Sequence, residues 1–378
     1  MNIIKKSIAT LAILSATLSV AQETPKTTFS GNADFYYRFD FANAGNIGVT
    51  NNLTSFTNSH DSFELGMASI KATHKEGKAS VVADLGFGTR AKEFTYNDND
   101  TQFMIKQLNM TYEFTDKFKV TAGAFTTHLG FELLDATDNK NYSMSYAFTN
   151  GPFFNTGVKA QYTTGKFSIM AGVTNPTDFK TAVQAGSNQK TIIGQLGYAG
   201  ETGSAYLNFT TGSNNPSTFN NQQIDLVVTK KIGEKLTLGF NGTFATVSND
   251  PPPPVSDVSW FSAIGYIQVV TSKATSLAYR IEYFGNNDGA KYANPLSPAS
   301  PVYPAIFDPK FNVISNTLSL NFKEGRFTFI PEVRFDIASK NIFSTSKDLD
   351  PLDPKFAFNP FVLSESAASI LLATTYSF

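Results

Sequence analysis

The chain ends on the stretch Ser366-Ala-Ala-Ser-Ile-Leu-Leu-Ala-Thr-Thr-Tyr-Ser-Phe378, in which two kinds of residue alternate. One parity is apolar and finishes on aromatic residues: Ala368, Ile370, Leu372, Thr374, Tyr376 and Phe378. The other parity is mostly small and polar: Ser369, Leu371, Ala373, Thr375 and Ser377. Because successive side chains of a β-strand point to opposite faces, this alternation predicts a terminal strand with one apolar face.

A C-terminal amphipathic strand that finishes on Phe resembles the last strand of bacterial outer-membrane β-barrels. In those proteins the aromatic end is recognised by the barrel-assembly machinery. The resemblance implies that Tyr376 and Phe378 serve as an assembly signal. It also implies a membrane location for a chain that has no run of about 18 apolar residues after residue 21, and hence no expected transmembrane helix.

The N-terminus carries the features of an export signal. Lys5 and Lys6 precede an apolar stretch at 8–20, and Ser19-Val20-Ala21 matches a small-x-small cleavage site. We therefore expect a cleaved signal peptide at 1–21 and a mature chain at 22–378 that forms a single domain. The sequence contains no Cys, which excludes disulfides, thiolate metal sites and a lipoprotein-type boundary.

The charge balance is mild. The signal contains two of the 30 Lys and Arg residues and none of the 31 Asp and Glu residues, so the mature chain has a net charge of −3 (28 − 31). This balance favours neither nucleic acid nor a polyanionic partner. Hydrophobic residues make up 41%, as in a soluble protein, but a barrel also needs apolar residues only at alternate strand positions. A secreted all-β protein is the alternative.

Alternation of the same kind recurs along the chain and distinguishes a membrane barrel from a secreted all-β protein. In segment 29–41 the odd positions are apolar or small, whereas the even positions include Ser30, Asn32, Asp34, Arg38 and Asp40. The pattern returns in 79–90, 107–114, 236–246, 274–285 and 326–337. A soluble sandwich rarely shows it over so many strands with aromatic residues on the apolar side, so the pattern favours a barrel.

The connections order the strands. Seven short polar segments have the composition of tight hairpins: 74–78, 115–117, 164–166, 200–203, 232–235, 271–273 and 323–326. Eight longer segments alternate with them: 42–60, 91–101, 128–154, 175–190, 213–221, 249–257, 286–312 and 338–365. Fifteen connections join sixteen strands. The sequence therefore predicts an all-β fold, a transmembrane antiparallel up-and-down β-barrel of about 16 strands with short periplasmic turns and long outer loops.

Several segments leave the strand count open. Segment 258–271 is apolar on both parities, and 62–72 changes parity midway, as a β-bulge would cause. Pro331 interrupts another strand pattern. Segment 142–149 could form a further strand, so fourteen and eighteen strands also fit.

Barrels of this size enclose an aqueous channel. The inward parity of the predicted strands carries charges of both signs, which we expect to line the pore: Arg38, Asp40, Asp84, Arg90, Glu113, Arg280, Glu282, Glu332, Arg334 and Asp336. Isolated charges in a dry core would be costly. The alternative is that these residues pair across neighbouring strands and stabilise the wall.

Segment 128–154 is the third outer loop. In general porins the loop at this place folds inward and narrows the channel. Here it contains Glu132, Asp135, Asp138 and Lys140, so we expect Glu132 and Asp135 to lie at a constriction that mildly prefers cations. The alternative is a loop that lies outside the barrel as a cover.

The same region carries a family resemblance. Gly123-Ala-Phe-Thr-Thr-His-Leu-Gly130-Phe-Glu132, Asn139, Asn141-Tyr-Ser143 and Thr156-Gly157-Val158 resemble the G-x-F…G-x-E…N…S…T-G pattern of the OmpL-like β-barrel porins of Bacteroidota. The resemblance extends over essentially the whole mature chain. It implies a pore in the outer membrane of a Gram-negative bacterium. The family pattern often has Arg after the Ser, where this chain has Met144.

Other chemistries find less support. His60, His74 and His128 show no pattern of a barrel protease or phospholipase, so we expect no enzyme. The acidic segments 97–100 and 348–353 do not match the twelve-residue calcium loop, so we expect neither a metal site nor a cofactor, although calcium binding by these loops stays open. A TonB-dependent transporter would need a plug domain, and only 22–28 precede the first strand.

We therefore expect an outer-membrane porin that lets small hydrophilic solutes diffuse passively through a polar lumen of mixed charge, narrowed by the loop at 128–154. Its other partners would be outer-membrane lipid and lipopolysaccharide, and a homotrimer is compatible with sixteen strands. The alternative is a non-conducting barrel that acts at the cell surface through its Pro-rich outer loops, around 251–254 and 295–304.

Overall fold

A computed structural model of the protein describes residues 25–42, 50–96, 104–181, 189–213, 219–249, 255–286, 288, 310–345 and 362–378. The expected signal peptide, the two acidic segments and the two Pro-rich segments lie outside these residues. Within the described parts of the chain, no helix has the length and apolar character to cross a membrane.

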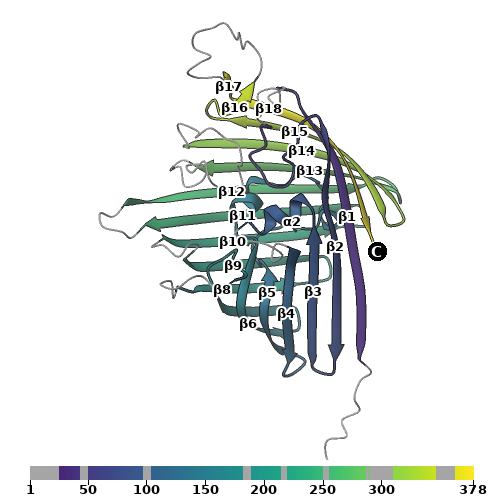
Figure 1. The fold of residues 1–378 in the computed structure, drawn as a ribbon, viewed down its shortest axis with the longest axis vertical. Coiled ribbons are helices and arrows are strands. Elements are labelled where there is room, and N and C mark those ends of the chain that lie inside the picture. The colour runs from purple at the N-terminus through teal and green to yellow at the C-terminus, as the bar shows by residue number, and fades with distance from the viewer. Residues whose placement is uncertain are drawn as a thin grey trace, which may run out of the picture.

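Sixteen strands of the described chain form one closed antiparallel barrel, in which neighbours in the chain are neighbours in space (Figure 1). In chain order they are β1 (Lys26–Asp40), β2 (Ser62–Glu76), β3 (Ala79–Phe87), β4 (Ile105–Glu113), β5 (Phe118–Thr126), β6 (Phe154–Thr164), β7 (Phe167–Thr174), β8 (Thr191–Ala199), β9 (Gly203–Ser213), β10 (Phe219–Ile232), β11 (Leu236–Asn249), β12 (Val255–Val270), β13 (Thr275–Asn286), β14 (Phe311–Glu324), β15 (Phe327–Ala338) and β18 (Ser366–Ser377). The predicted fold class and the count of sixteen strands are confirmed.

The first and last strands close the ring. β1 pairs with β18 from Asn32 opposite Ser377 to Asp40 opposite Ser369. Beyond this register, the backbone N–H of Phe378 donates to the carbonyl of Gly31 at 2.9 Å, and the N–H of Gly31 donates to the carbonyl of Phe378 at 3.1 Å. The terminal residue therefore completes the seam between the two ends of the sheet.

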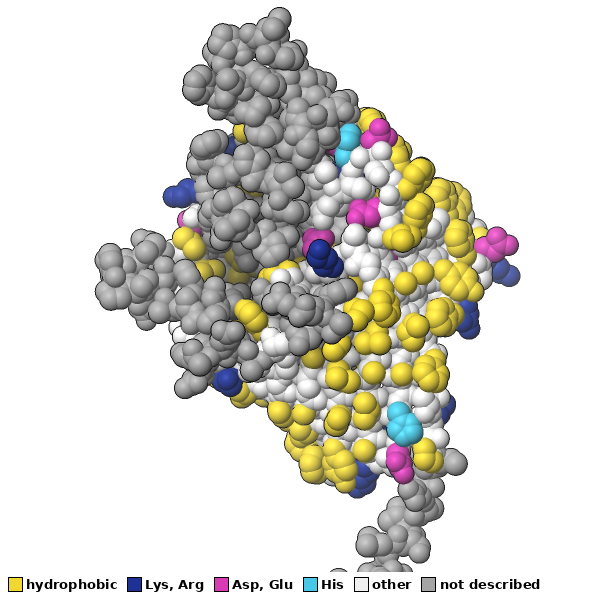
Figure 2. All heavy atoms as spheres, viewed as in Figure 1, with side chains coloured by type: hydrophobic (Ala, Val, Ile, Leu, Met, Phe, Trp, Pro, Cys, Tyr) yellow, Lys and Arg dark blue, Asp and Glu magenta, His cyan; other side chains and the backbone are white. Residues whose placement is uncertain are grey.

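Alternating side chains divide the wall into two faces. In β18, Leu371, Ala373 and Thr375 are buried, whereas Leu372 and Tyr376 are 38% and 47% exposed. The same alternation leaves apolar side chains across the outer wall, where Figure 2 shows them spread over the visible strands. An outer apolar band with polar residues inside is the arrangement that a membrane barrel requires.

The short turns lie at one end of the barrel, together with the first residue of β1 and the last residue of β18 (Figure 1). Gly77 and Gly325 adopt φ angles of 53° and 59° in two of these turns, the left-handed region that glycine enters without strain. Because neighbouring strands are antiparallel, the strand ends that the longer connections join lie at the other end. This separation matches the expected alternation of short turns and long outer loops.

Three local features differ from, or refine, the sequence expectations. The ladder between β1 and β2 shifts register between Ala33 and Phe35, which explains the change of parity in 62–72. Segment 142–149 is not a strand, because it leads into the helix α3 (Tyr146–Asn150), whose first turn is capped when the Ser145 hydroxyl accepts from the N–H of Phe148. The last outer loop contains a separate hairpin, β16 (Phe343–Thr345) with β17 (Val362–Ser364), which the sequence did not indicate.

Candidate functional site

The loop between β5 and β6, residues 127–153, folds into the barrel and is called the inward loop below. It contains the short 3₁₀ helix η3 (Ala136–Asp138) and the helix α3. Its first residues attach to the wall: the N–H of Gly130 donates to Asp225 of β10 at 3.0 Å, and the N–H of Phe131 donates to Asn241 of β11 at 3.2 Å. The loop thus lies inside the ring and not over its mouth.

Arg280 of β13 holds the middle of the inward loop. Its guanidinium forms an ion pair with Glu132 and donates to the carbonyls of Ser143 at 2.6 Å and Met144 at 3.2 Å. A further hydrogen bond reaches Thr317 of β14 at 3.1 Å. Arg280 is fully buried and Glu132 is only 6% exposed, so the pair does not face open water. Its role is to stabilise the loop.

Two wall carboxylates bind the backbone of the inward loop. Glu332 of β15 accepts from the N–H groups of Tyr142 at 2.7 Å and Ser143 at 3.1 Å. Glu282 of β13 accepts from the N–H groups of Tyr146 and Ala147, both at 2.8 Å. These last two N–H groups begin helix α3 and have no partner within the helix, so Glu282 satisfies donors that would otherwise be orphaned.

Arg334 and Asp336 of β15 extend the same contact. Arg334 pairs with Asp336 at 3.0 Å and donates to the carbonyl of Met144 at 2.8 Å. Its guanidinium lies over the ring of Tyr146, 5.2 Å from the centroid, and the hydroxyl of Tyr146 donates to Asp336 at 3.0 Å. Two wall arginines, Arg280 and Arg334, therefore both bind the backbone carbonyl of Met144.

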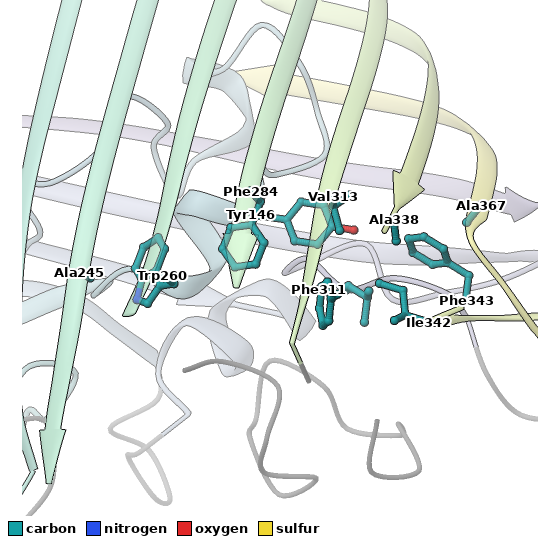
Figure 3. Close-up of a cluster of buried hydrophobic side chains, with 11 residues drawn as sticks. Tyr146, Ala245, Trp260, Phe284, Phe311, Val313, Ala338, Ile342, Phe343 and Ala367 are labelled. Atoms are coloured by element: carbon teal, nitrogen blue, oxygen red, sulfur yellow. The ribbon is translucent and has the colours of Figure 1, made fainter. Parts of the chain in front are cut away.

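Apolar contacts fix helix α3 between the wall and the last outer loop. The ring of Tyr146 stacks on Phe284 of β13 at 5.2 Å between centroids, and Phe284 in turn contacts Trp260 of β12 at 5.9 Å. Figure 3 shows these rings beside Phe343 and other buried side chains of the same cluster. The wall thus holds α3 through both charge and packing.

A second group of contacts involves the short helix α2 (Thr89–Phe94) in the second outer loop. Arg90 of this helix is fully buried, lies 3.2 Å from Asp34 of β1 and sits over the rings of Phe56 and Tyr142. Asp34 also accepts from the hydroxyl of Tyr142 at 2.9 Å. Arg90 therefore belongs to a loop helix and not to a strand, and it joins three outer loops to β1.

Lys106 of β4 binds the remaining acids of this side. Its ammonium lies 3.2 Å from Asp84 of β3 and 2.6 Å from Asp135 of the inward loop. Both acids that the sequence placed at the constriction, Glu132 and Asp135, are therefore ion-paired with basic residues of the wall.

The other three predicted pore-lining residues lie elsewhere. Arg38 donates to the carbonyl of Thr50 at 2.7 Å, and Asp40 accepts from Asn51 at 2.7 Å, so both hold the first outer loop. Glu113 lies at the short-turn end, where it pairs with Lys75 at 2.9 Å on an exposed surface. The structure thus brings most of the predicted residues to contacts between the wall and the loops, and places Glu113 apart from them.

Sequence reasoning missed Asp34, Lys106 and Asp225. Asp225 accepts from Gly130 N–H, Asn208 at 2.8 Å, Asn241 at 2.5 Å and Thr243 at 2.8 Å, and is 1% exposed. Asp34 and Asp225 stand on the inward parity of their strands, so the alternation that identified Asp84 could have found both. Lys106 gives no such signal, because the register of β3 and β4 shifts beside it.

Burial changes the titration of Glu93 in α2. Its carboxylate accepts from the N–H of Phe56 at 3.0 Å and the side-chain amide of Asn58 at 2.9 Å. Loss of hydration outweighs these contacts and raises the pKa of Glu93 to about 7. This carboxyl therefore changes its charge near neutral pH.

Four cavities adjoin one another between the inward loop and the wall, from strands β8 to β12 at one end of the row to strands β12 to β15 and β18 at the other. From the long-loop end to the short-turn end their volumes are about 120, 20, 40 and 200 Å³. Gln223 lines the first two cavities, Phe131 the second and third, and Lys140 the third and fourth. The smallest cavity lies beside Asp225 and Asn241.

The histidines do not form a common site. His60 accepts from the N–H of Asp40 at 3.0 Å, His74 bonds to Thr27 at 2.8 Å, and His128 bonds to the carbonyl of Phe209 at 3.0 Å. Each therefore has a separate structural partner. Among the described residues, no group of three or more His, Asp or Glu side chains is arranged to hold a metal ion.

Comparisons with known proteins place this geometry among membrane barrels. A family model described as putative beta-barrel porin-2, OmpL-like, matches residues 26–378. An anion-selective porin from Comamonas acidovorans superposes with a TM-score of 0.59 at 11% identity, over 94% of this chain and 100% of that one. A trimer form of OmpT, an outer membrane protein of Vibrio cholerae, gives 0.57 at 11% identity over 94% and 100%. At these identities the likeness shows the fold alone. Comparison with curated proteins finds no match.

Proposed function

The chain belongs to the OmpL-like family of beta-barrel porins, and from this membership we propose that it lets small hydrophilic solutes diffuse passively across the outer membrane. The family and the closed sixteen-stranded barrel identify an outer-membrane porin. The solutes, the route and the selectivity are our proposal. Diffusion along a route of this kind requires no covalent chemistry.

The row of adjoining cavities is the observation that carries the proposal. It runs along the inward loop from strands β8 to β12 at the long-loop end to strands β12 to β15 and β18 at the short-turn end. We propose that solutes move along this off-centre route. Its smallest cavity measures about 20 Å³, close to the space that one water molecule needs, so loop fluctuations must enlarge it during passage.

The carboxylate that sets the electrostatic field along this route is not one of those that the sequence suggested. Glu132 and Asp135 have basic partners, whereas Asp225 borders the smallest cavity and is held by amide, hydroxyl and N–H groups. A carboxylate at a constriction attracts cations. We therefore propose that the expected mild cation preference arises from Asp225.

Planar-bilayer recording of the refolded mature chain, 22–378, tests the function. We expect small, stable single-channel currents and a reversal potential on the cation side under a salt gradient. Asp225→Asn keeps the size of the side chain and removes its charge, so its reversal potential should move toward zero. Glu113→Gln, at the exposed pair with Lys75, is the matched control and should leave the reversal potential unchanged.

A folded protein that inserts without conducting would refute passive diffusion. The second candidate function is that of a non-conducting barrel that acts through its outer loops, and one observation favours it. The first and second outer loops and the inward loop together fill much of the interior, with Leu53, Arg90 and Tyr142 all buried. The absence of current from the folded wild type would therefore direct attention to loop partners at the cell surface.

We also propose that the signal peptide is cleaved after Ala21 and that the mature barrels form homotrimers in a membrane of lipid and lipopolysaccharide. The trimer form of the Vibrio cholerae barrel supports this assembly by analogy of fold. The mass of the detergent-solubilised native protein before and after heating measures the oligomeric state, and a monomer under all conditions would contradict the trimer.

A further inference from the structure

The cavity at the long-loop end faces two buried polar atoms of the wall that no protein group satisfies. It measures about 120 Å³ and lies between strands β8 to β12 and the loops inside the barrel. Thr210 Oγ1 and Asn221 Oδ1 of the wall make no hydrogen bond to another protein group. Glu93 of α2, whose carboxyl interacts with the Ser55 hydroxyl, lines the same cavity. Buried polar atoms are normally paired, so two unpaired ones on the wall of one cavity indicate a guest that hydrogen-bonds to both.

Aromatic side chains line the same cavity. Phe153 of the inward loop and Trp260 of β12 are 5% and 2% exposed, and Tyr96 lies at the outer edge. Ligand sites commonly combine such rings with a few placed polar groups. The C–H face of a sugar ring is apolar and can pack on an aromatic ring while its hydroxyls bond to the polar groups.

The other polar lining is largely neutral. Thr149, Asn150 and Gln223 add hydroxyl and amide groups, and none of the described residues that line the cavity is Lys or Arg. Asp178, the second acid here, already accepts from the N–H groups of Phe153 at 2.7 Å and Phe154 at 3.1 Å. Because burial raises the pKa of Glu93 to about 7, its neutral form is also present near neutral pH. These groups suit hydroxyl partners better than a free cation.

We propose that this cavity binds a neutral polyhydroxylated solute of the carbohydrate type, which hydrogen-bonds to Thr210, Asn221 and Glu93. Its volume has room for roughly ten water molecules, about the size of one hexose ring. A longer saccharide would extend from the cavity toward the outer mouth. The inference deepens the proposed pore by adding a solute site at its entrance.

Trp260 provides a direct test, because it is the only tryptophan of the chain. Its fluorescence in the refolded mature protein is titrated with maltose, with a polyethylene glycol of similar size as the inert control. Thr210→Val combined with Asn221→Leu removes both unpaired groups at nearly constant volume. Thr229→Val makes the same chemical change on β10 outside the cavity.

We expect a saturable response to maltose and none to the glycol. The double variant should bind maltose about tenfold more weakly, as for two lost neutral hydrogen bonds, and Thr229→Val should bind it like the wild type. Heat-modifiable mobility on SDS gels checks that each variant is folded, and Thr210→Val alone serves if the double variant is not.

Three results would overturn the site: no saturable response in the wild type, equal affinity in the double variant, or displacement of maltose by free lysine, which would reveal a cation site. The fluorescence needs no current. Binding without conduction would therefore refute the pore and keep the site, whereas conduction without binding would refute the site and keep the pore.

Discussion

Most of the charged residues inside this barrel hold the loops against the wall. Arg280 contacts Glu132, Ser143 and Met144 of the inward loop from one position on β13. A guanidinium presents five donors in a fixed plane, so one buried Arg can hold several loop atoms at once. The alternative that these charges pair across neighbouring strands describes Lys106 and Asp84. The pairs of Arg280 with Glu132, Lys106 with Asp135 and Arg90 with Asp34 join the wall to a loop instead.

Glu93 makes the packing of the first two outer loops sensitive to pH. Its pKa is raised from 4.5 to about 7, so folding favours its neutral form. This contribution to stability is fully present below pH 4.5 and is lost as the pH rises through about 7. We expect more frequent current fluctuations at pH 8 than at pH 5. Glu93→Gln can still accept from Phe56 and Asn58 and should remove this difference; an unchanged pH profile in Glu93→Gln would rule out Glu93 as its source.

At the scale of elements, the inward loop is a segment of polar backbone made stable inside a barrel. Its N–H groups donate hydrogen bonds to Asp225, Glu282 and Glu332. Its carbonyls accept from Arg280 and Arg334. Backbone polar groups need such partners when they leave water. The wall therefore specifies the path of the loop residue by residue.

Loss of Arg280 should loosen this element. In Arg280→Met, Glu132 keeps only its bonds to Ser145, and removing one partner of a buried pair typically costs about 3–5 kcal/mol. We expect larger and noisier single-channel currents. Adding Glu132→Gln removes the uncompensated charge and should partly reduce the noise of the single-channel current. The control is Arg326→Met, the same change in an exposed turn; noise in Arg326→Met equal to that in Arg280→Met would contradict a specific role.

The sequence was informative about elements because their signals are local. A period of two and a short turn can be read within ten residues, and these predicted sixteen strands and the outward-facing parity of β18. The inward placement of the third loop came instead from the resemblance to general porins. The pairing partners are not local: Glu132 and Arg280 lie 148 positions apart. No spacing rule reveals such a pair, so the charges were predicted to be inside but their partners were not.

At the scale of the whole molecule, the closed ring depends on its terminal residue. The side chain of Phe378 is 52% exposed, whereas its backbone pairs with Gly31 across the seam. An exposed ring adds little to stability. Its value as an assembly signal can therefore be separated from its value in the fold.

We expect Phe378→Ala to refold in detergent nearly as well as the wild type, since its backbone hydrogen bonds remain. In cells, the amount of folded protein in the outer membrane should fall severalfold, because the assembly machinery would lose its signal. Phe327→Ala, which changes a Phe of 42% exposure on the neighbouring strand at the same end, is the control. An equal loss in both variants in cells would refute a recognition role for Phe378.

Tyr142 has a consequence for how the ring closes. Its hydroxyl binds Asp34 of β1 and its N–H binds Glu332 of β15, and only β18 lies between these strands. The inward loop thus spans the closing seam from within. We expect the loop to be in place before β1 and β18 pair, and the finished wall to resist separation of these two strands.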